Sequence, residues 1–246
     1  MKPLYIIKTG STFPDTLKHY GDFDQWILAA MGPEGRGTLV ADAQNEAPLP
    51  EPERCAGIII TGSHSMVTDT APWQVRLEEW VKRILAAGVP VFGLCYGHQL
   101  LARAAGGEAG FHPAGREVGT VRIRGLDACG TDPLFSAMPA SFPAHATHAQ
   151  TVLTLPPGAV CLAENSHDPH HAFRVGENAW GVQFHPEFNE AIMTEYILKR
   201  RADLAAGGLD PDRLVRTVCP TPESAGLLPA FAALVEMASK KSREPV

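Results

Sequence analysis

The sequence predicts an α/β protein of three α/β/α layers, in which helices cover both faces of a mostly parallel sheet. The first observation is that short apolar runs alternate with helical stretches over residues 1–105, an order typical of parallel strands joined by helices. The second is a change of pattern between residues 110 and 185, where short β-like runs are broken by glycine, proline and histidine. We expect added antiparallel or mixed strands there.

Apolar residues at helical or alternating spacing locate the individual elements. The clearest helix has an apolar face formed by Val75, Leu77, Trp80, Val81, Ile84 and Leu85. Strands are expected at 3–8, 37–41, 57–61, 89–94, 117–124, 151–155, 159–163, 171–175 and 179–184. Helices are expected at 22–31, 73–87, 96–105, 189–205 and 223–240. Residues 10–22 are expected to form a long loop, either a lid or a solvated connection.

The composition is typical of a globular protein. The chain has 246 residues, of which 45% are hydrophobic and 20% charged, so it can bury a full core. A net charge of −6 without a basic run argues against a nucleic-acid partner. The apolar stretch before Lys8 is too short for a signal peptide or a membrane span. The five cysteines form no Cys-x-x-Cys pair and cannot all be bridged, which predicts a reducing, cytoplasmic location.

One cysteine, Cys95, lies in the turn between the strand expected at 89–94 and the helix expected at 96–105. Gly93 and Gly97 flank it, and a sharp strand-to-helix turn needs such residues without side chains. The unpaired N–H groups and partial positive charge at the start of a helix favour a thiolate over a thiol. A buried structural cysteine is the alternative, and the two glycines favour a nucleophile instead.

A nucleophilic cysteine needs a base, and among the ten histidines His185 has the most suitable setting. It follows the strand expected at 179–184, and Pro186 keeps the chain extended there. His185 and Glu187 then lie on the same face, so the carboxylate can orient the imidazole. Taken alone, the motif is also compatible with a surface His-Pro-Glu turn.

Two motifs together indicate a family. Gly-Leu-Cys-Tyr-Gly-His-Gln at 93–99 is followed by Gly-Val-Gln-Phe-His-Pro-Glu at 181–187, and the pair resembles the class I (triad) glutamine amidotransferase family. The turn at 61–67 and the extra C-terminal residues are most similar to the GMP-synthase-like stand-alone type of that family. The resemblance implies the flavodoxin-like fold of that family and an amidotransferase domain over residues 1–205. Residues 206–246 exceed the resemblance, and we expect a C-terminal helical extension packed on the same domain.

The resemblance also implies a catalytic triad and a reaction. Cys95 corresponds to the nucleophile, His185 to the general base and acid, and Glu187 to the carboxylate that orients the histidine. The implied reaction is hydrolysis of the glutamine side-chain amide. Cys95 attacks the amide carbon, protonated His185 releases ammonia, and water cleaves the γ-glutamyl thioester to give glutamate. No cofactor and no metal are expected.

Two positions correspond to substrate contacts in the family. Gln99 matches a residue that helps to hold glutamine. His148 belongs to a segment whose backbone faces the substrate's α-amino and α-carboxylate groups. Relatives often carry Ser-His-x-Asp in this segment, whereas this chain has Thr-His-Ala-Gln at 147–150, with Gln150 in place of the aspartate.

The tetrahedral intermediate of this reaction needs an oxyanion hole. One donor is expected to be the backbone N–H of Tyr96, which opens the helix after the nucleophile. The second is expected from the turn after the strand at 57–61, where Gly62 and Ser63 follow the buried run. Relatives often have Gly-Gly-Pro in this turn, so this chain keeps the central glycine and lacks the proline.

Histidines crowd one region and raise the question of a metal site. They are His145, His148, His167, His170 and His171. The His-x-x-His pair lies in sequence typical of a loop, and neither a Cys-x-x-Cys pair nor a carboxylate-bearing helix completes a tetrahedral set. We therefore do not expect a metal ion there.

The destination of the released nitrogen is open at this stage. The chain contains no Ser-Gly-Gly-x-Asp-Ser loop and no Gly-x-x-x-x-Gly-Lys-Ser/Thr motif for ATP. The first hypothesis is a glutaminase that supplies ammonia to a separate ATP-dependent synthetase. The second is a γ-glutamyl peptidase that uses the same triad on γ-glutamyl peptides without a synthetase. The third is a non-catalytic regulatory module with a relic site, which the intact triad residues argue against.

Overall fold

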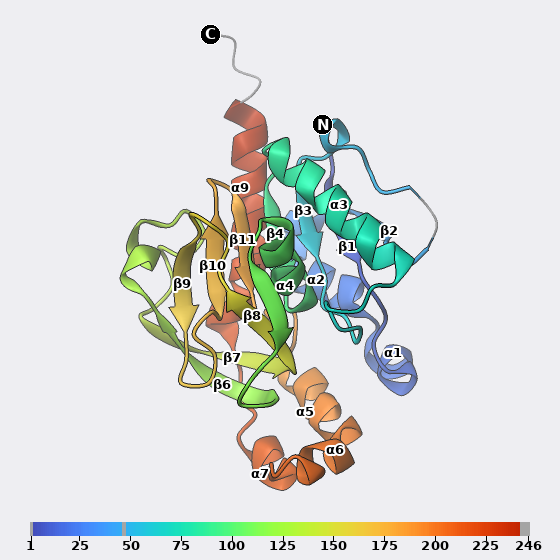
Figure 1. Cartoon of the computed structure of the whole chain (residues 1–246), viewed down its shortest axis with the longest axis vertical. Coiled ribbons are helices and arrows are strands. Elements are labelled where there is room, and N and C mark those ends of the chain that lie inside the picture. The colour runs from blue at the N-terminus through green and yellow to red at the C-terminus, as the bar shows by residue number, and fades with distance from the viewer. Residues whose placement is uncertain (1, 46–47, 242–246) are drawn as a thin grey trace.

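The computed structural model describes residues 2–45 and 48–241, and a large β-sheet forms its centre (Figure 1). The strands are β1 (Leu4–Lys8), β2 (Leu39–Asp42), β3 (Gly57–Ile60), β4 (Val91–Leu94), β5 (Glu108–Phe111), β6 (Glu117–Gly125), β7 (Ser141–His148), β8 (Gln150–Thr154), β9 (Val160–Glu164), β10 (Ala172–Val175) and β11 (Ala179–Val182). Within the described residues, nine of them form one sheet in the order β2-β1-β3-β4-β11-β10-β9-β6-β7. β5 and β8 form a separate antiparallel pair.

The large sheet has a parallel part and an antiparallel part, as the sequence predicts. β2, β1, β3, β4 and β11 are parallel, and β10, β9, β6 and β7 extend the sheet with antiparallel pairing. The four residues of β3 and of β4 are all buried, which explains their continuous apolar sequences. Because the carboxyl ends of parallel strands meet at one edge of a sheet, this topology brings together the residues that follow β3, β4 and β11.

Helices cover both faces of the parallel part. They are α1 (Pro14–Tyr20), α2 (Phe23–Met31), α3 (Pro72–Ala86), α4 (Tyr96–Ala104), α5 (Glu190–Lys199), α6 (Arg201–Ala206), α7 (Pro211–Arg216), α8 (Pro222–Ala225) and α9 (Leu227–Lys241), with short 3₁₀ turns at Gly32–Gly35, Pro52–Arg54 and Asp127–Thr131. On one face, Ile59 and Phe92 pack in a cluster with Phe231 of α9. On the other face, Ile58 packs in a cluster with Trp80 of α3. These two layers confirm the α/β/α prediction.

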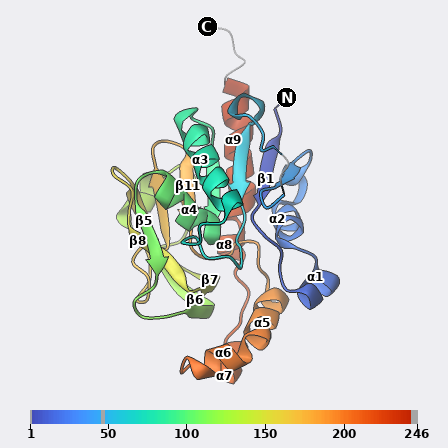
Figure 2. The same ribbon diagram turned by 45° about the vertical axis from the view of Figure 1, so that its right-hand side comes forward.

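A third cluster lies beyond one end of the sheet. Figure 1 and Figure 2 both show α5, α6 and α7 together at the end of the molecule opposite the last turn of α9. Tyr196 and Ile192 of α5 pack there against Phe23 and Trp26 of α2 and against Val118 of β6. This cluster fixes α5 beside the edge where the parallel strands end.

Several segments differ from the pattern expected from the sequence, and the helix expected at 223–240 is two helices, α8 and α9. The stretch at 10–22, expected as a loop, contains α1, whose first residue is a proline. The segment with His145 and His148, expected to be loop-like, is strand β7, because it pairs with β6 along its whole length. The helix expected at 189–205 is two helices that meet at Arg200.

The C-terminal part of the chain packs on the sheet. Leu228, Phe231 and Val235 of α9 are buried in the same cluster as the central strands. The last five residues of the expected extension at 206–246 lie outside the described part of the chain. The division into a domain ending at residue 205 and an extension stays a prediction.

Two observations concern the setting of the chain. Within residues 2–45 and 48–241, no helix combines the length and the apolar character that crossing a membrane requires. The cysteines are all free, and they are Cys55, Cys95, Cys129, Cys161 and Cys219. A cytoplasmic location stays a prediction.

Candidate active site

Cys95 stands at a sharp turn between β4 and α4. Its φ angle is +49°, the only positive value among the described non-glycine residues. This region is unfavourable for a residue with a side chain, and such strain is common at functional sites. Two backbone hydrogen bonds hold the turn, because the Cys95 N–H donates to Val182 of β11 at 2.9 Å and the Cys95 carbonyl accepts from Gln99 at 3.1 Å.

The two glycines beside Cys95 are needed because backbone segments approach closely. A Cβ atom on Gly93 would lie 2.4 Å from the carbonyl oxygen of Gly97, and one on Gly97 would lie 2.5 Å from that of Ile60. Neither separation is possible for a real side chain, and neither neighbour is a flexible side chain. The turn that presents Cys95 therefore depends on both glycines.

His185 and Glu187 form a buried pair next to this turn. The Nδ1 atom of His185 lies 2.8 Å from Oε1 of Glu187. The backbone N–H of His185 donates to the carbonyl of His145 on β7 at 2.7 Å, and its ring stacks on Phe188 with centroids 4.1 Å apart. Three different contacts therefore fix the position of this imidazole.

The surroundings of His185 favour its protonated form. Burial alone would lower its pKa. The opposite effect is larger, because Glu187 and Cys95 each contribute a negative charge and a hydrogen bond, and together they raise the pKa to about 10. Near neutral pH the ring therefore holds a proton next to Cys95.

The turn after β3 lies against the same pair. A Cβ atom on Gly62 would lie 2.8 Å from Cε1 of His185 and 3.7 Å from Cβ of Cys95, so only glycine fits without a shift. The Thr9 hydroxyl donates to the Gly62 carbonyl at 2.9 Å, and the Ser63 hydroxyl donates to the Thr9 carbonyl at 2.7 Å. Thr9 on the loop after β1 therefore holds this turn in place.

Two glutamine side chains connect the nucleophile to the rest of the site. The amide nitrogen of Gln183 lies 3.5 Å from the sulfur of Cys95. The amide nitrogen of Gln99 donates to Oε1 of Gln183 at 3.0 Å and to the carbonyl of Gln150 at 2.6 Å. Gln99 therefore has only its Oε1 atom free for a ligand. Gln183 is absent from the site residues expected from the sequence, although it shares the alternating face of His185 and Glu187.

The segment from His148 to Gln150 is held by side chains rather than by an aspartate. Nδ1 of His148 lies 3.0 Å from the carbonyl oxygen of Gln150. The Gln150 side chain accepts from the backbone N–H of Val67 at 2.8 Å and donates to the Thr68 hydroxyl at 2.6 Å. The neutral Gln150 thus links this segment to the loop that follows the Gly62 turn.

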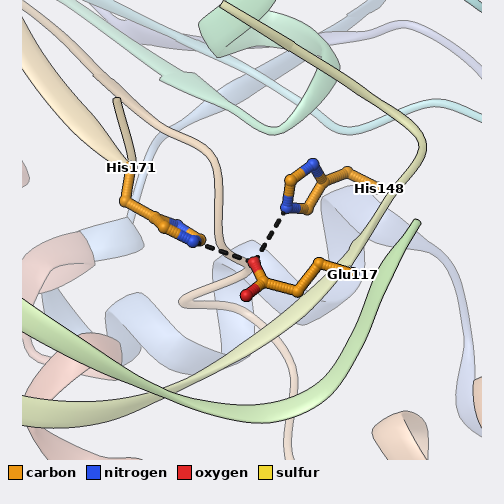
Figure 3. A group of neighbouring side chains, drawn as sticks. All are labelled: Glu117, His148 and His171. Atoms are coloured by element: carbon orange, nitrogen blue, oxygen red, sulfur yellow. Dashed lines mark hydrogen bonds and ion pairs between the residues drawn. The ribbon is translucent and has the colours of Figure 1, made fainter. Parts of the chain in front are cut away.

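Glu117 joins two of the clustered histidines. Figure 3 shows the rings of His148 and His171 directed at its carboxylate, with Nε2 to Oε2 distances of 3.0 and 2.9 Å. Asn165 donates to the other oxygen at 2.7 Å. Burial alone would raise the pKa of Glu117, but these two histidines hold it well below its usual value.

The same three residues are the one group within the described residues whose ligand atoms lie close enough to hold a metal ion. Two imidazoles and a carboxylate are a donor set that Zn²⁺ accepts. The carboxylate already accepts hydrogen bonds at both oxygens, so the group forms a hydrogen-bonded network in which the buried Nδ1 atom of His171 has no partner in the described part of the chain. We interpret it as the support of the His148 segment. Glu117 precedes the region of clustered histidines by about thirty residues, so local sequence gave no sign of it.

A pocket opens over Cys95. The expected site residues that line it are Ser63, Cys95, Tyr96, Gln99, His148 and His185. Residues from outside the motifs also line it, among them His64, Tyr196, Arg116 and Arg200. The pocket is thus formed by the ends of the parallel strands, the start of α4 and the far end of α5.

The comparison with known families agrees with this geometry. Residues 18–203 match the family model described as glutamine amidotransferase class-I. The chain belongs to the class I glutamine amidotransferase family. Membership supports an enzyme with a glutamine-hydrolysing role.

Individual relatives of this amidotransferase include GMP synthases and gamma-glutamyl peptidases. The GMP synthase of Aeropyrum pernix is 37% identical over 146 residues, which cover 59% of this chain and 26% of the synthase. The chain spans about a quarter of the length of the GMP synthases that it matches. Gamma-glutamyl peptidase 4 of Arabidopsis thaliana is 30% identical over 189 residues, which cover 73% of each chain.

Solved structures of other amidotransferases share the fold. The glutamine amidotransferase of Methylobacillus flagellatus superposes with a TM-score of 0.72 at 25% identity, and the match covers 98% of this chain and 95% of that chain. A glutamine amidotransferase of Thermotoga maritima has a TM-score of 0.70 at 19% identity, covering 96% and 98% of the two chains. These matches confirm the predicted class I amidotransferase fold.

Proposed function

We propose that this amidotransferase hydrolyses the side-chain amide of glutamine through a γ-glutamyl thioester on Cys95. The observation that carries the proposal is the strained turn of Cys95 beside the buried His185–Glu187 pair. Nucleophilic acyl transfer by a cysteine requires a histidine within reach of the sulfur and a carboxylate that orients the histidine.

The steps follow from these positions. The sulfur of Cys95 attacks the amide carbon, and the negative charge moves to the carbonyl oxygen. Backbone N–H groups of Tyr96 and of the turn at Gly62 and Ser63 then stabilise this oxyanion. When the C–N bond breaks, His185 gives its proton to the leaving nitrogen, and ammonia departs.

The second half of the reaction regenerates the enzyme. The now neutral His185 takes a proton from water, and the resulting hydroxide attacks the thioester carbon. The C–S bond breaks, glutamate leaves, and the sulfur of Cys95 again pairs with protonated His185. Glu187 holds the ring orientation in both halves. Gln99 contributes Oε1 to the glutamyl group, and the backbone of the His148 segment lines the same part of the pocket.

Replacement of the nucleophile tests this proposal. We expect Cys95→Ala to lower glutamate release from glutamine by about 10³-fold or more, because no thioester can form. Cys219→Ala is the matched control, since Cys219 is an exposed free cysteine. Circular dichroism is used to check that both variants are folded. Unchanged activity in Cys95→Ala would refute the proposal.

The ammonia can serve a separate synthetase. The relatives named glutamine-hydrolysing GMP synthase support this, because that name joins glutamine hydrolysis to a synthase. We propose an ATP-dependent synthetase as the partner. Glutaminase activity measured with and without candidate synthetases tests it, and a partner is expected to raise the rate of glutamate release.

A γ-glutamyl peptidase is the second candidate function. It is favoured by a specific observation, since the match to gamma-glutamyl peptidase 4 extends over 73% of both chains. The same steps apply, with an amine in place of ammonia as the leaving group. Higher kcat/KM for γ-glutamyl dipeptides than for glutamine in the isolated chain would favour this function over ammonia supply.

We also propose that the chain works in a reducing compartment such as the cytoplasm. Support comes from the five free cysteines, including the one at the proposed active site. Thiol quantification of the chain isolated under non-reducing conditions tests this, and five free thiols are expected.

A further inference from the structure

Two arginines line the pocket without a salt bridge to any described carboxylate. Arg116 precedes β6, and Arg200 lies between α5 and α6. Among the described residues, neither guanidinium forms a salt bridge with a carboxylate, and no Asp or Glu lines this pocket. The Nε atom of Arg200 is shielded from solvent and has no hydrogen-bond partner. A buried donor of this kind costs free energy unless a ligand completes it.

The two positive charges act on the same region. The pKa of Arg116 is lowered by burial and by the charge of Arg200. Burial together with the charge of Arg200 lowers the pKa of His64, on the same wall, to about 4. This positive region lies in a chain whose net charge is −6. The charge of Asp203 opposes this lowering at Arg116 but forms no salt bridge with it, and like charges clustered in this way are typical of a site for an anion.

The surroundings of Arg200 hold its guanidinium at the pocket. Its Cζ atom lies 5.3 Å from the centroid of the Phe13 ring, within the range of a cation–π contact. Phe13 packs in turn against Tyr196 with centroids 5.2 Å apart. The Tyr196 hydroxyl is hydrogen-bonded to Thr12 at 2.8 Å. The charge is therefore positioned by packed aromatic rings rather than by a carboxylate.

These contacts place Arg200 on the His185 side of the nucleophile. The ring of His185 stacks on Phe188, and Phe188 packs against Tyr196 with centroids 4.8 Å apart. His185 is the residue that protonates the leaving nitrogen in the proposed reaction. Tyr196, Arg116 and Arg200 line the same pocket as His185, so a group attached to that nitrogen can extend toward them.

We propose that Arg116 and Arg200 form a subsite for a carboxylate carried by the leaving group of a γ-glutamyl amide. The chemical class of substrate is a γ-glutamyl amino acid or peptide with a free carboxylate beyond the scissile bond. Glutamine lacks this second carboxylate, since its leaving group is ammonia. The inference rests on the proposed γ-glutamyl transfer to Cys95 and adds the identity of the leaving group.

A pair of substrates isolates the carboxylate. γ-Glutamylglycine and γ-glutamylglycinamide differ only in the charge at the far end of the leaving group. The wild-type chain is expected to hydrolyse γ-glutamylglycine with a kcat/KM about tenfold or more above that for γ-glutamylglycinamide. A difference of this size is expected because a hydrogen bond to a charged group is lost with the carboxylate. Arg200→Gln and Arg116→Gln are expected to reduce this ratio toward one. Arg122→Gln, an exposed arginine on β6, is the matched control and keeps the wild-type ratio.

The outcomes separate this inference from the proposed function. Equal kcat/KM for the two substrates in the wild type would overturn the subsite while leaving the thioester chemistry intact. Equal losses for acid, amide and glutamine in the arginine variants would also overturn it, because the arginines would then bind the common glutamyl part. If Cys95→Ala still releases glutamate from all three substrates at the wild-type rate, the proposed function itself is refuted.

Binding provides a readout that does not depend on turnover. In the full-length Cys95→Ala chain, calorimetry is expected to give a Kd for γ-glutamylglycine about tenfold below that for γ-glutamylglycinamide. Adding Arg200→Gln to this chain is expected to remove the difference. Equal Kd values for the two ligands in Cys95→Ala would contradict the subsite even if the enzyme proves inactive on both.

Discussion

Cys95 has a strained backbone conformation and lies beside the His185–Glu187 pair. Its positive φ angle aims the side chain at the pocket, while two backbone hydrogen bonds and two glycines hold the turn. On the other side, His185 is fixed by Glu187 and by the ring of Phe188. The packing around the turn therefore offsets an unfavourable conformation that exposes the sulfur to a substrate.

Glu187→Gln tests the role of the carboxylate that contacts His185. The substitution removes the charge that is the main cause of the raised pKa of His185, so the pKa should fall from about 10 toward its ordinary value near 6.5. Loss of the orienting carboxylate is expected to lower kcat by about 10²- to 10⁴-fold. NMR titration of the His185 ring and glutaminase assays measure both effects, with exposed Glu190→Gln as control.

The pH dependence of stability gives an independent check of the same pair. The pKa of His185 is higher in the folded state than in the unfolded state, so protonation of this ring stabilises the fold. The contribution is complete below about pH 6.5 and is lost as the pH rises toward about 10. In Glu187→Gln that loss between neutral and alkaline pH should be smaller than in the wild type. An unchanged pH profile of the unfolding free energy would contradict the assigned cause.

Individual site residues differed in how far local sequence could reveal them. Cys95, His185 and Glu187 lie in two short motifs, and the structure brings these three residues together as expected. Glu117 and Arg200 come from segments without such a motif and reach the site only through strand pairing and helix packing. Gln183 lies within a motif, but its contact with Cys95 depends on the register between β11 and β4.

At the scale of elements, the turn between β4 and α4 depends on close backbone contacts. α4 approaches β3 so tightly that Gly97 lies against the carbonyl of Ile60. The helix start, the strand end and the Gly62 turn are therefore fixed relative to one another. This proximity is what allows the start of α4 and the turn after β3 to serve one site.

Gly97→Ala tests this dependence. A Cβ atom would lie 2.5 Å from a backbone oxygen that cannot move away without shifting β3. We expect a loss of about 1–3 kcal/mol in the free energy of unfolding and a fall in glutaminase rate. Gly130→Ala is the control, because a Cβ atom there meets nothing within 4 Å. Equal stability of the two variants in urea would contradict the close packing.

Elements with strong periodicity were predicted well, and those set by tertiary pairing were not. α3 extends over 72–86 where the sequence predicts 73–87, because its apolar face has clear helical spacing. β7 carries histidines and a proline with no clear alternation, and it is a strand because β6 pairs with it over eight residues. The kink at Arg200 likewise has no local breaker such as proline, and it lies where α5 and α7 both pack against β6.

At the scale of the whole molecule, the parallel part of the sheet is closed on one face by α2 and α9. The ring of Phe231 packs on Phe92 of β4 with centroids 5.4 Å apart and on Trp180 of β11 at 6.2 Å. β4 and β11 end at Cys95 and near His185. The last helix thus supports the two strands that carry the proposed catalytic residues, and we propose that the chain folds as one unit.

Phe231→Ala tests this dependence on the last helix. Loss of a fully buried aromatic ring is expected to lower the free energy of unfolding by about 3–5 kcal/mol. Met237→Ala is the control on the same helix, because Met237 is 51% exposed. Denaturant unfolding followed by circular dichroism should show one transition for each variant. A separate early transition for α9 would argue for an extension that folds independently.

Covalent labelling of the nucleophile tests the central claim most directly. A glutamine analogue with a diazoketone in place of the amide alkylates the group that attacks the γ-carbonyl position. Peptide mass spectrometry is expected to find one label per chain, on Cys95 and on none of the other four cysteines, with loss of glutaminase activity and protection by glutamine. Inactivation with the label on another residue, or full activity with Cys95 labelled, would contradict the account.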